Sequence, residues 1–291
     1  MNMKLINYIS TICKEDKPLK FLLAKILMRI KISSFLTIKR KEYRLRFYPS
    51  AYSRILWINN NYENPVLDFV HAYLREGDIL VDVGANIGLV TVESSLIVGQ
   101  KGKIYSFEPH PKVFNFLRGN ILLNHLTNIE TFNVALGNTH GNILFSDEIS
   151  DDQNSIKNSG TGVNIPIRRL DELIDLPNVT LLKIDVEGYE KFVLIGAAKL
   201  LKITKCVFFE ATEQAMRKYD YSIEDIYDIF ISNKFQLFRI NDKKEISPIT
   251  KTYRPKTIGL SGEDLLAIRN IDDFLQRTGY TLITNKQQET P

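Results

Sequence analysis

Apolar residues in the first fifty positions follow two different periods. Between residues 18 and 30 they recur every three or four positions, which predicts an amphipathic helix with Pro18 in its first turn. From Tyr43 to Tyr48 apolar and basic side chains alternate, which predicts one strand of a hairpin with a wet face. We therefore expect residues 1–60 to form a basic helical segment followed by a β-hairpin. The apolar positions of the helix are Leu19, Leu22, Leu23, Ile26, Leu27 and Ile30.

From about residue 64 the pattern changes to short apolar runs that alternate with helical stretches. Such alternation predicts right-handed βαβ units and a doubly wound, mostly parallel α/β sheet with helices on both faces. We expect one domain over residues 61–285, a polar loop over 146–162 and a frayed tail over 286–291. The expected strands are 79–83, 103–107, 128–134, 179–184, 205–209, 235–240 and a late one at 265–268, and the expected helices are 65–74, 87–98, 111–123, 170–174, 188–201 and 223–232.

Composition narrows the class of protein. Apolar residues make up 44% of the 291 positions and charged residues 25%, which is ordinary for a soluble globular protein. Only two cysteines are present, Cys13 and Cys206, which argues against a disulfide framework or a zinc site and for a reducing compartment. Residues 1–13 lack the pattern of a signal peptide, and no apolar stretch is long enough to span a membrane. We expect a cytoplasmic protein.

Charge is unevenly distributed. Residues 1–50 contain 12 Lys/Arg and 3 Asp/Glu, whereas the other 241 residues contain 26 and 31. The basic excess therefore belongs to the N-terminal segment, and we expect no nucleic-acid partner. The helix predicted at 18–30 could pack on the main domain or lie on an anionic membrane surface. We favour packing, because this periodicity most often marks a face that is turned toward a core.

Acidic side chains follow four of the first five predicted strands. In a doubly wound sheet the ligand lies at the carboxyl ends of the strands, so these are candidate site residues. A sheet that only has to fold has no need of this arrangement. The residues at the strand ends are Asp82 with Gly84 and Gly88, then Glu108, Ala135, Asp185 with Glu187, and Glu210.

The glycine loop opens a helix, so its N–H groups favour an anionic part of a ligand. Its spacing, Asp82-x-Gly84-x-x-x-Gly88, differs from the dinucleotide fingerprint Gly-x-Gly-x-x-Gly, because Asn86 replaces the middle glycine. This replacement weakens an NAD interpretation without excluding it. Glu108 follows Gly88 by 20 residues, where a carboxylate can accept hydrogen bonds from both hydroxyls of a ribose.

The run Asp185-Val186-Glu187-Gly188-Tyr189-Glu190 is the second dense cluster. Asp185 and Glu187 can both face the cleft if the strand ends there, or Asp185 can cap the helix that follows. None of the four histidines lies in a serine nucleophile motif, and no phosphate-binding Gly-x-x-x-x-Gly-Lys loop occurs. Hydrolase and nucleoside triphosphatase functions are therefore not supported.

Six segments of the sequence, taken in order, resemble the FkbM family of methyltransferases that use S-adenosylmethionine (SAM). They are VDVGANIG, SFEPHP, NVALGN, RRLDEL, LLKIDVEGYE and, behind it, VLIGA. The resemblance covers roughly residues 60–212. It implies a class I methyltransferase (Rossmann-like) fold, with seven strands of which the last is antiparallel. It also implies that Glu108 holds the ribose, that Val134 and Ala135 lie beside the adenine, and that the loop of Asp82, Gly84, Ala85, Asn86 and Gly88 surrounds the amino-acid part of SAM.

The resemblance implies methyl transfer to a hydroxyl of a sugar or another small molecule, since acceptors in the family vary. A hydroxyl acceptor benefits from a general base, for which Asp185 is our first candidate and Glu187 our second. The same acids could instead hold a divalent cation, and the sequence does not decide between the two. Acidic Asp82 would attract the positively charged end of SAM. An NAD-dependent oxidoreductase and a non-catalytic SAM-binding module are the alternative functions. We expect residues 1–60, 146–162 and 213–262 to select the acceptor.

Overall fold

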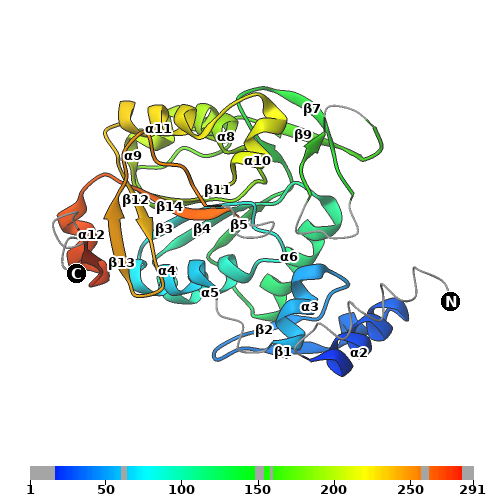
Figure 1. Ribbon diagram of the computed structural model, residues 1–291. Coiled ribbons are helices and arrows are strands. Elements are labelled where there is room, and N and C mark those ends of the chain that lie inside the picture. The colour runs from blue at the N-terminus through cyan, green and yellow to red at the C-terminus, as the bar shows by residue number, and fades with distance from the viewer. Residues whose placement is uncertain (1–16, 60–63, 148–153, 158–159, 257–261, 284–291) are drawn as a thin grey trace.

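The computed structural model describes residues 17–59, 64–147, 154–157, 160–256 and 262–283 (Figure 1). The tail predicted at 286–291 and the first 13 residues lie outside these ranges. Within them the main sheet has nine strands in the order β15-β13-β12-β14-β11-β10-β3-β4-β5. The strands are β3 (Ile79–Val83), β4 (Lys103–Phe107), β5 (Ile129–Phe132), β10 (Val179–Ile184), β11 (Thr204–Ala211), β12 (Gln236–Ile240), β13 (Glu245–Pro248), β14 (Glu263–Ile268) and β15 (Thr281–Leu282).

The predicted α/β class is confirmed. Strands β5, β4, β3, β10 and β11 are parallel, and β14 is antiparallel to both of its neighbours, β11 and β12. The seven expected strands are therefore present. The number seven was too low, because β13 returns from β12 through a tight turn and β15 pairs with β13 at that edge. Both added strands are too short to show a clear period in the sequence.

Helices cover both faces of the sheet (Figure 1). Successive residues of a strand point to opposite faces, and in β10 Leu181 belongs to one apolar cluster while Leu182 and Ile184 belong to the other. The first cluster includes α4 (Pro65–Tyr73), α5 (Leu89–Val98), α6 (Pro111–Leu123) and α12 (Ile271–Thr278). The second includes α7 (Leu170–Leu173), α8 (Glu190–Gly196), α9 (Ala198–Ile203) and α11 (Ile223–Ser232). The single helix predicted at 188–201 is thus two helices that meet at Ala197.

A second, four-stranded sheet has the order β6-β9-β7-β8. Its strands are β6 (Ala135–Leu136), β7 (Gly141–Phe145), β8 (Ile156–Lys157) and β9 (Val163–Arg168). The sequence analysis did not predict this sheet. The strand expected at 128–134 ends earlier, at Phe132, and part of the loop expected at 146–162 is strand β8. Residues 148–153 and 158–159 of that predicted loop lie outside the described ranges.

The N-terminal segment contains α2 (Pro18–Arg29), η1 (Ser33–Phe35), β1 (Thr37–Lys39), β2 (Arg44–Arg46) and α3 (Ala51–Ile58). The predicted hairpin is confirmed, since β1 and β2 pair in antiparallel register. Asn120 and Asn124, one turn apart on α6, accept hydrogen bonds from the backbone N–H groups of Arg46 and Arg44 at 2.8 and 2.9 Å. These side chains pair with the outer edge of β2, whose strand partner among the described residues is β1 alone, and so attach the hairpin to the main domain.

Helix α2 also packs on the domain, but not through the predicted face. Phe21 and Ala24 are its buried residues, and Lys17 and Lys20 donate hydrogen bonds to the last residues of α3, where the helix dipole favours a cation. The expectation that the leucine and isoleucine stripe faces the core is wrong. Those side chains lie on the outside, at exposures that range from 38% for Leu22 to 82% for Leu19, apart from partly buried Leu27. Among the described residues, no helix combines the length and the apolar character that crossing a membrane requires.

Candidate active site

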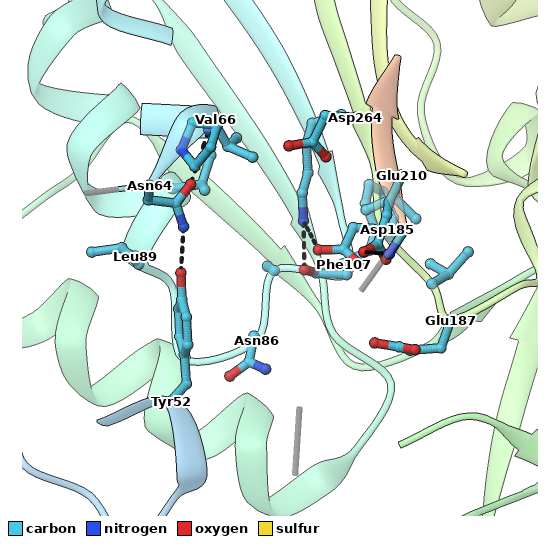
Figure 2. Close-up of a pocket in the computed structure, with 18 of the residues that line it drawn as sticks. Tyr52, Asn64, Val66, Asn86, Leu89, Phe107, Asp185, Glu187, Glu210 and Asp264 are labelled. Atoms are coloured by element: carbon cyan, nitrogen blue, oxygen red, sulfur yellow. Dashed lines mark hydrogen bonds and ion pairs between the residues drawn. The ribbon is translucent and has the colours of Figure 1, made fainter. Parts of the chain in front are cut away.

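A cavity of about 960 Å³ opens at the carboxyl ends of the parallel strands (Figure 2). The loops after β3, β4, β10 and β11 supply one wall, as expected for a doubly wound sheet. Residues of all three regions expected to select the acceptor also line the cavity. They are Tyr52 and Ile55 of α3, Asn154 and Ile156 before and in β8, and Ile240, Asn241, Asp242 and Lys244 at the turn between β12 and β13.

Both glycines of the loop after β3 have a left-handed backbone, and at Gly84 a backbone contact also excludes a side chain. Gly84 has a φ of +80°, and a Cβ on it would lie 1.8 Å from the carbonyl oxygen of Asp185. Gly88, at a φ of +90°, precedes α5, and a Cβ there would lie 2.6 Å from Leu117 Cδ1 on α6. Gly84, Ala85 and Asn86 line the cavity, whereas Gly88 does not. The spacing thus reflects close packing within the protein, and the approach of a ligand to this loop stays a prediction.

Asp82 also lies beneath the loop, outside the lining of the cavity. Its side chain is fully buried, and its Oδ2 accepts a hydrogen bond of 2.6 Å from Thr91 Oγ1 on α5. Its Oδ1 is 3.5 Å from the Lys183 ammonium. Asp82 therefore fixes the start of α5 against the sheet and can act on a ligand only through the loop that it supports.

Lys183 is a site residue that the sequence analysis missed. It lies in β10, pairs in register with Asp82 of β3, and is 4% exposed. Its Nζ donates to the Gly84 carbonyl at 2.9 Å and is 3.4 Å from Asp185 Oδ2. Burial lowers the pKa of Lys183, but the carboxylates of Asp185 and Asp82 outweigh burial and hold the pKa above its usual value. A lysine inside a buried apolar strand was the available signal.

Glu108 joins the end of β4 to the glycine loop. Its Oε2 accepts a hydrogen bond from the backbone N–H of Asn86 and its Oε1 one from that of His110, each at 2.9 Å. Asn86 itself has a φ of +51°, a left-handed conformation that asparagine tolerates better than most residues. The carboxylate of Glu108, together with Val134 and Ala135, lines the cavity. The structure therefore brings together the residues that we predicted for the ribose and the adenine.

Three carboxylates converge at the other end of this wall. One oxygen each of Asp185, Glu187 and Glu210 lies within 4.8 Å of the others. Figure 2 shows Asp185, Glu210 and Asp264 grouped together, with Glu187 on the loop nearby. Antiparallel pairing of β14 with β11 sets Asp264 directly opposite Glu210. The sequence analysis did not single out Asp264, because only the order of strands makes it a neighbour.

Burial and the repulsion of neighbouring carboxylates raise the pKa values of Glu187, Glu210 and Asp264. Burial first and the charge of Asp185 second raise the pKa of Glu187 to about 8. Burial, again followed by Asp185, raises the pKa of Glu210 to about 7, and burial followed by Glu210 raises that of Asp264 to about 7. Carboxyl groups whose pKa values lie near neutrality can exchange protons with a reacting group, as a general base must.

The turn after β10 holds Glu187 in an unusual backbone conformation. Glu187 has a φ of +56°, which is costly for a residue with a side chain, and such conformations concentrate at functional sites. Buried Glu190 stabilises the turn, since its Oε1 accepts hydrogen bonds from the N–H groups of Val186 and Gly188 at 3.3 and 3.1 Å. Helix α8 has Tyr189 as its N-cap, without a side-chain cap. The alternative in which Asp185 caps this helix is therefore wrong.

Oxygen ligands in this number also suit a divalent cation such as Mg²⁺. Asp185, Glu187 and Glu210 could each supply one ligand atom. The ammonium of Lys183, at 3.4 Å from Asp185, already supplies a positive charge on one side of the cluster. The donor set therefore fits a cation but does not require one.

Comparisons with known proteins match the part of the chain that contains these residues. The model of the methyltransferase FkbM domain matches residues 82–240, more than half of the chain. Hexuronic acid methyltransferase AglP of Haloferax volcanii is 30% identical over 153 residues, which are 51% of this chain and 62% of that protein. A probable cobalt-precorrin-6B C(15)-methyltransferase of Sulfolobus acidocaldarius is 42% identical over 65 residues, 22% of this chain and 34% of that protein. The chain thus spans less than two thirds of the length of these two relatives.

Other matches are more distant. Methyltransferase 1 of Beauveria bassiana is 24% identical over 176 residues, 46% of this chain and 70% of that protein. A solved structure of a putative rRNA-methylase from Clostridium thermocellum superposes with a TM-score of 0.45 at 11% identity, over 72% of this chain and 98% of that one. The range that the family model matches begins at Asp82 in β3 and ends at Ile240, the last residue of β12, so it spans the strand ends described above. The chain belongs to the FkbM family of methyltransferases.

Proposed function

We propose that this protein transfers the methyl group of SAM to a hydroxyl group of a sugar or another small molecule. One observation carries the proposal: the glycine loop, Glu108 and the raised-pKa Glu187 all face the same cavity of about 960 Å³. A cavity of that volume is large enough for a cofactor and a small acceptor together.

The residues present fit SAM. The backbone of Gly84, Ala85 and Asn86 would lie along its amino-acid part, and Val134 and Ala135 beside the adenine. Glu108 would accept hydrogen bonds from the ribose hydroxyls. In this arrangement the hydroxyls would share the carboxylate with the backbone N–H groups of Asn86 and His110. When bound, SAM supplies a methyl group on a sulfonium that is ready for displacement.

We assign the general base to Glu187. Its pKa of about 8 lies close to neutral pH, and its carboxylate lines the cavity. In this assignment Glu187 takes the proton of the acceptor hydroxyl, while Asp185, paired with Lys183 at 3.4 Å, helps to raise the pKa of Glu187 and holds the turn. This reverses the order of candidates that the sequence suggested.

Two observations support a sugar as the acceptor. Hexuronic acid methyltransferase AglP, at 30% identity, is named for a sugar acid. The lining of the cavity also includes many groups that can exchange hydrogen bonds with hydroxyls. They are Tyr52, Asn64, Asp68, Asn241, Asp242 and Lys244.

Calorimetry with S-adenosylhomocysteine (SAH), with NAD as the comparison ligand, tests the cofactor. We expect SAH to bind at micromolar concentration and NAD not to bind; binding of NAD alone would overturn the proposal.

Incubation with labelled SAM and hexuronic acid conjugates, with and without EDTA, tests the reaction. We expect a labelled methyl ether, formed equally well with EDTA. If EDTA abolishes the reaction, the three acids hold a catalytic cation instead of acting as bases. If SAH binds but no methyl group is transferred to any fraction of a cell extract, the protein is better described as a non-catalytic SAM-binding module.

A further inference from the structure

We propose that α2 and the turn after it attach this protein to an anionic lipid surface. The proposal concerns a face of the molecule outside the cavity and does not depend on the methyltransferase function. Figure 1 shows α2 at the edge of the molecule, away from the main sheet.

Helix α2 turns its larger apolar face outward. Phe21 and Ala24 hold it on the domain at 4% and 0% exposure. The opposite stripe follows helical spacing and is exposed, and the apolar exposure continues into η1 and its flanking residues. These side chains are Leu19, Leu22, Leu23, Ile26, Ile30, Ile32, Phe35 and Leu36, which we call the α2 patch.

Exposed apolar side chains are concentrated in this one region. Within the described residues, the large apolar side chains that are exposed outside the α2 patch are Leu122 on α6 and Ile231 on α11, in separate elements. Soluble surfaces carry scattered apolar residues, whereas a contiguous group marks a surface that interacts with something. A water-exposed stripe of this kind therefore calls for an apolar partner.

The charges around the α2 patch determine which partner fits. Among residues 17–50, ten are Lys or Arg and one, Glu42, is acidic. Arg29 and Lys31, at the end of α2, are exposed, as are Lys39 and Lys41 of the hairpin. An apolar helix face with basic residues around it lies at the boundary of headgroups and acyl chains, most favourably in anionic lipid.

A second copy of the chain fits this patch less well. A twofold dimer would bring the same surface together with itself, so Arg29 and Lys31 would face like charges from the other copy. Like charges across an interface oppose association. An anionic bilayer satisfies the apolar stripe and the basic rim at once, which is why we choose it as the partner.

The α2 patch lies one helix away from the cavity. Helix α2 contacts α3, and Tyr52 and Ile55 of α3 line the cavity. A protein docked through α2 therefore keeps its cavity close to the lipid surface, while the carboxyl ends of the strands remain outside the contact.

Flotation of the full chain with vesicles tests the proposal. We expect binding to vesicles that contain phosphatidylglycerol, weaker binding to phosphatidylcholine alone, and a decrease as salt is added, because salt screens exposed charges. Substituting Leu23→Glu with Ile26→Glu should lower partitioning about a hundredfold or more, since each of the two buried side chains contributes roughly one decade or more. Arg29→Glu with Lys31→Glu should abolish the preference for anionic lipid.

The matched controls are Leu122→Glu and Ile231→Glu, which make the same change at side chains that are 69% and 49% exposed elsewhere. They should bind vesicles like the unchanged chain. Melting temperature and SAH binding check that all variants fold. The proposal is overturned if the wild-type protein does not float with anionic vesicles at low salt, or if the variant with Leu23→Glu and Ile26→Glu binds vesicles as well as the wild type does. It is also overturned if light scattering shows a wild-type dimer that this double variant dissociates, while neither protein binds vesicles.

Discussion

The ammonium of Lys183 donates a hydrogen bond to the carbonyl oxygen of Gly84, 2.9 Å away, and so ties β10 to the loop after β3. The same ammonium is within 3.5 Å of Asp82 and Asp185. One buried cation therefore connects the acid beneath the glycine loop with the acid at the start of the turn after β10. The two motifs that the sequence presents a hundred residues apart form a single unit.

Lys183→Met tests this unit. Methionine keeps the length of the side chain but leaves two carboxylates without their cation, so we expect the free energy of unfolding to fall by about 3 kcal/mol. Urea denaturation measures it. Lys202→Met, on an exposed position of α9, is the control and should change stability little. If the two variants have the same free energy of unfolding, the Lys183 ammonium is not needed to compensate the charges of Asp82 and Asp185.

Gly84→Ala tests the contact between the loop and the Asp185 carbonyl. Gly77 has a similar φ, +87° against +80°, but a Cβ there would meet nothing within 4 Å. Gly77→Ala therefore reports only the backbone cost, about 1 kcal/mol. We expect Gly84→Ala to cost at least about 2 kcal/mol more, because the chain must separate from Asp185. Thermal melts of the pair give the difference, and similar values for both would refute the contact.

Glu108→Gln tests the proposed ribose contact. Losing a charged acceptor of hydrogen bonds costs about 1.5–3 kcal/mol, so SAH should bind about 10- to 100-fold more weakly. Calorimetry measures the dissociation constant. Glu130→Gln, at an exposed position on β5, should leave it unchanged. An unaltered affinity in Glu108→Gln would remove Glu108 from cofactor binding.

Glu187→Gln tests the general base. Turnover of the unchanged chain should rise as pH increases toward about 8, because the base must be ionised to accept a proton. The variant should lose about 100-fold or more in turnover and lose this rise, while SAH affinity is retained. Glu76→Gln, at an exposed site, is the control. If Asp185→Asn abolishes the pH dependence instead, the base is Asp185.

Stability should respond to the same group. The pKa of Glu187 rises from 4.5 to about 8 in the folded protein, so folding favours its protonated form. Its contribution to stability is full below pH 4.5 and is lost as pH rises through about 8. Glu187→Gln should therefore raise the melting temperature relative to the wild-type protein at about pH 9. This increase should be larger at about pH 9 than at about pH 5. A difference that is the same at both pH values would contradict the raised pKa.

The sequence by itself determined the class of fold and most of the candidate site. The periodicity of apolar residues predicted the parallel sheet. The position after each predicted strand identified the glycine loop, Glu108, Asp185, Glu187 and Glu210, because a ligand site in this fold lies where strands end. The same local patterns located the hairpin, whose alternation of buried Leu45 and Phe47 with wetter Arg44 and Arg46 is present in the structure.

Only the tertiary structure decided which of these residues meet and which side of an element faces the core. Asp264 becomes a neighbour of Glu210 through antiparallel pairing across more than fifty residues of chain. Lys183 joins Gly84 because β10 lies beside β3. Helix α2 is apolar on two sides, and the period cannot say which side packs: Phe21 and Ala24 fit the domain, and the leucine stripe stays outside. Periodicity is a property of one segment, whereas contact depends on the shape of another.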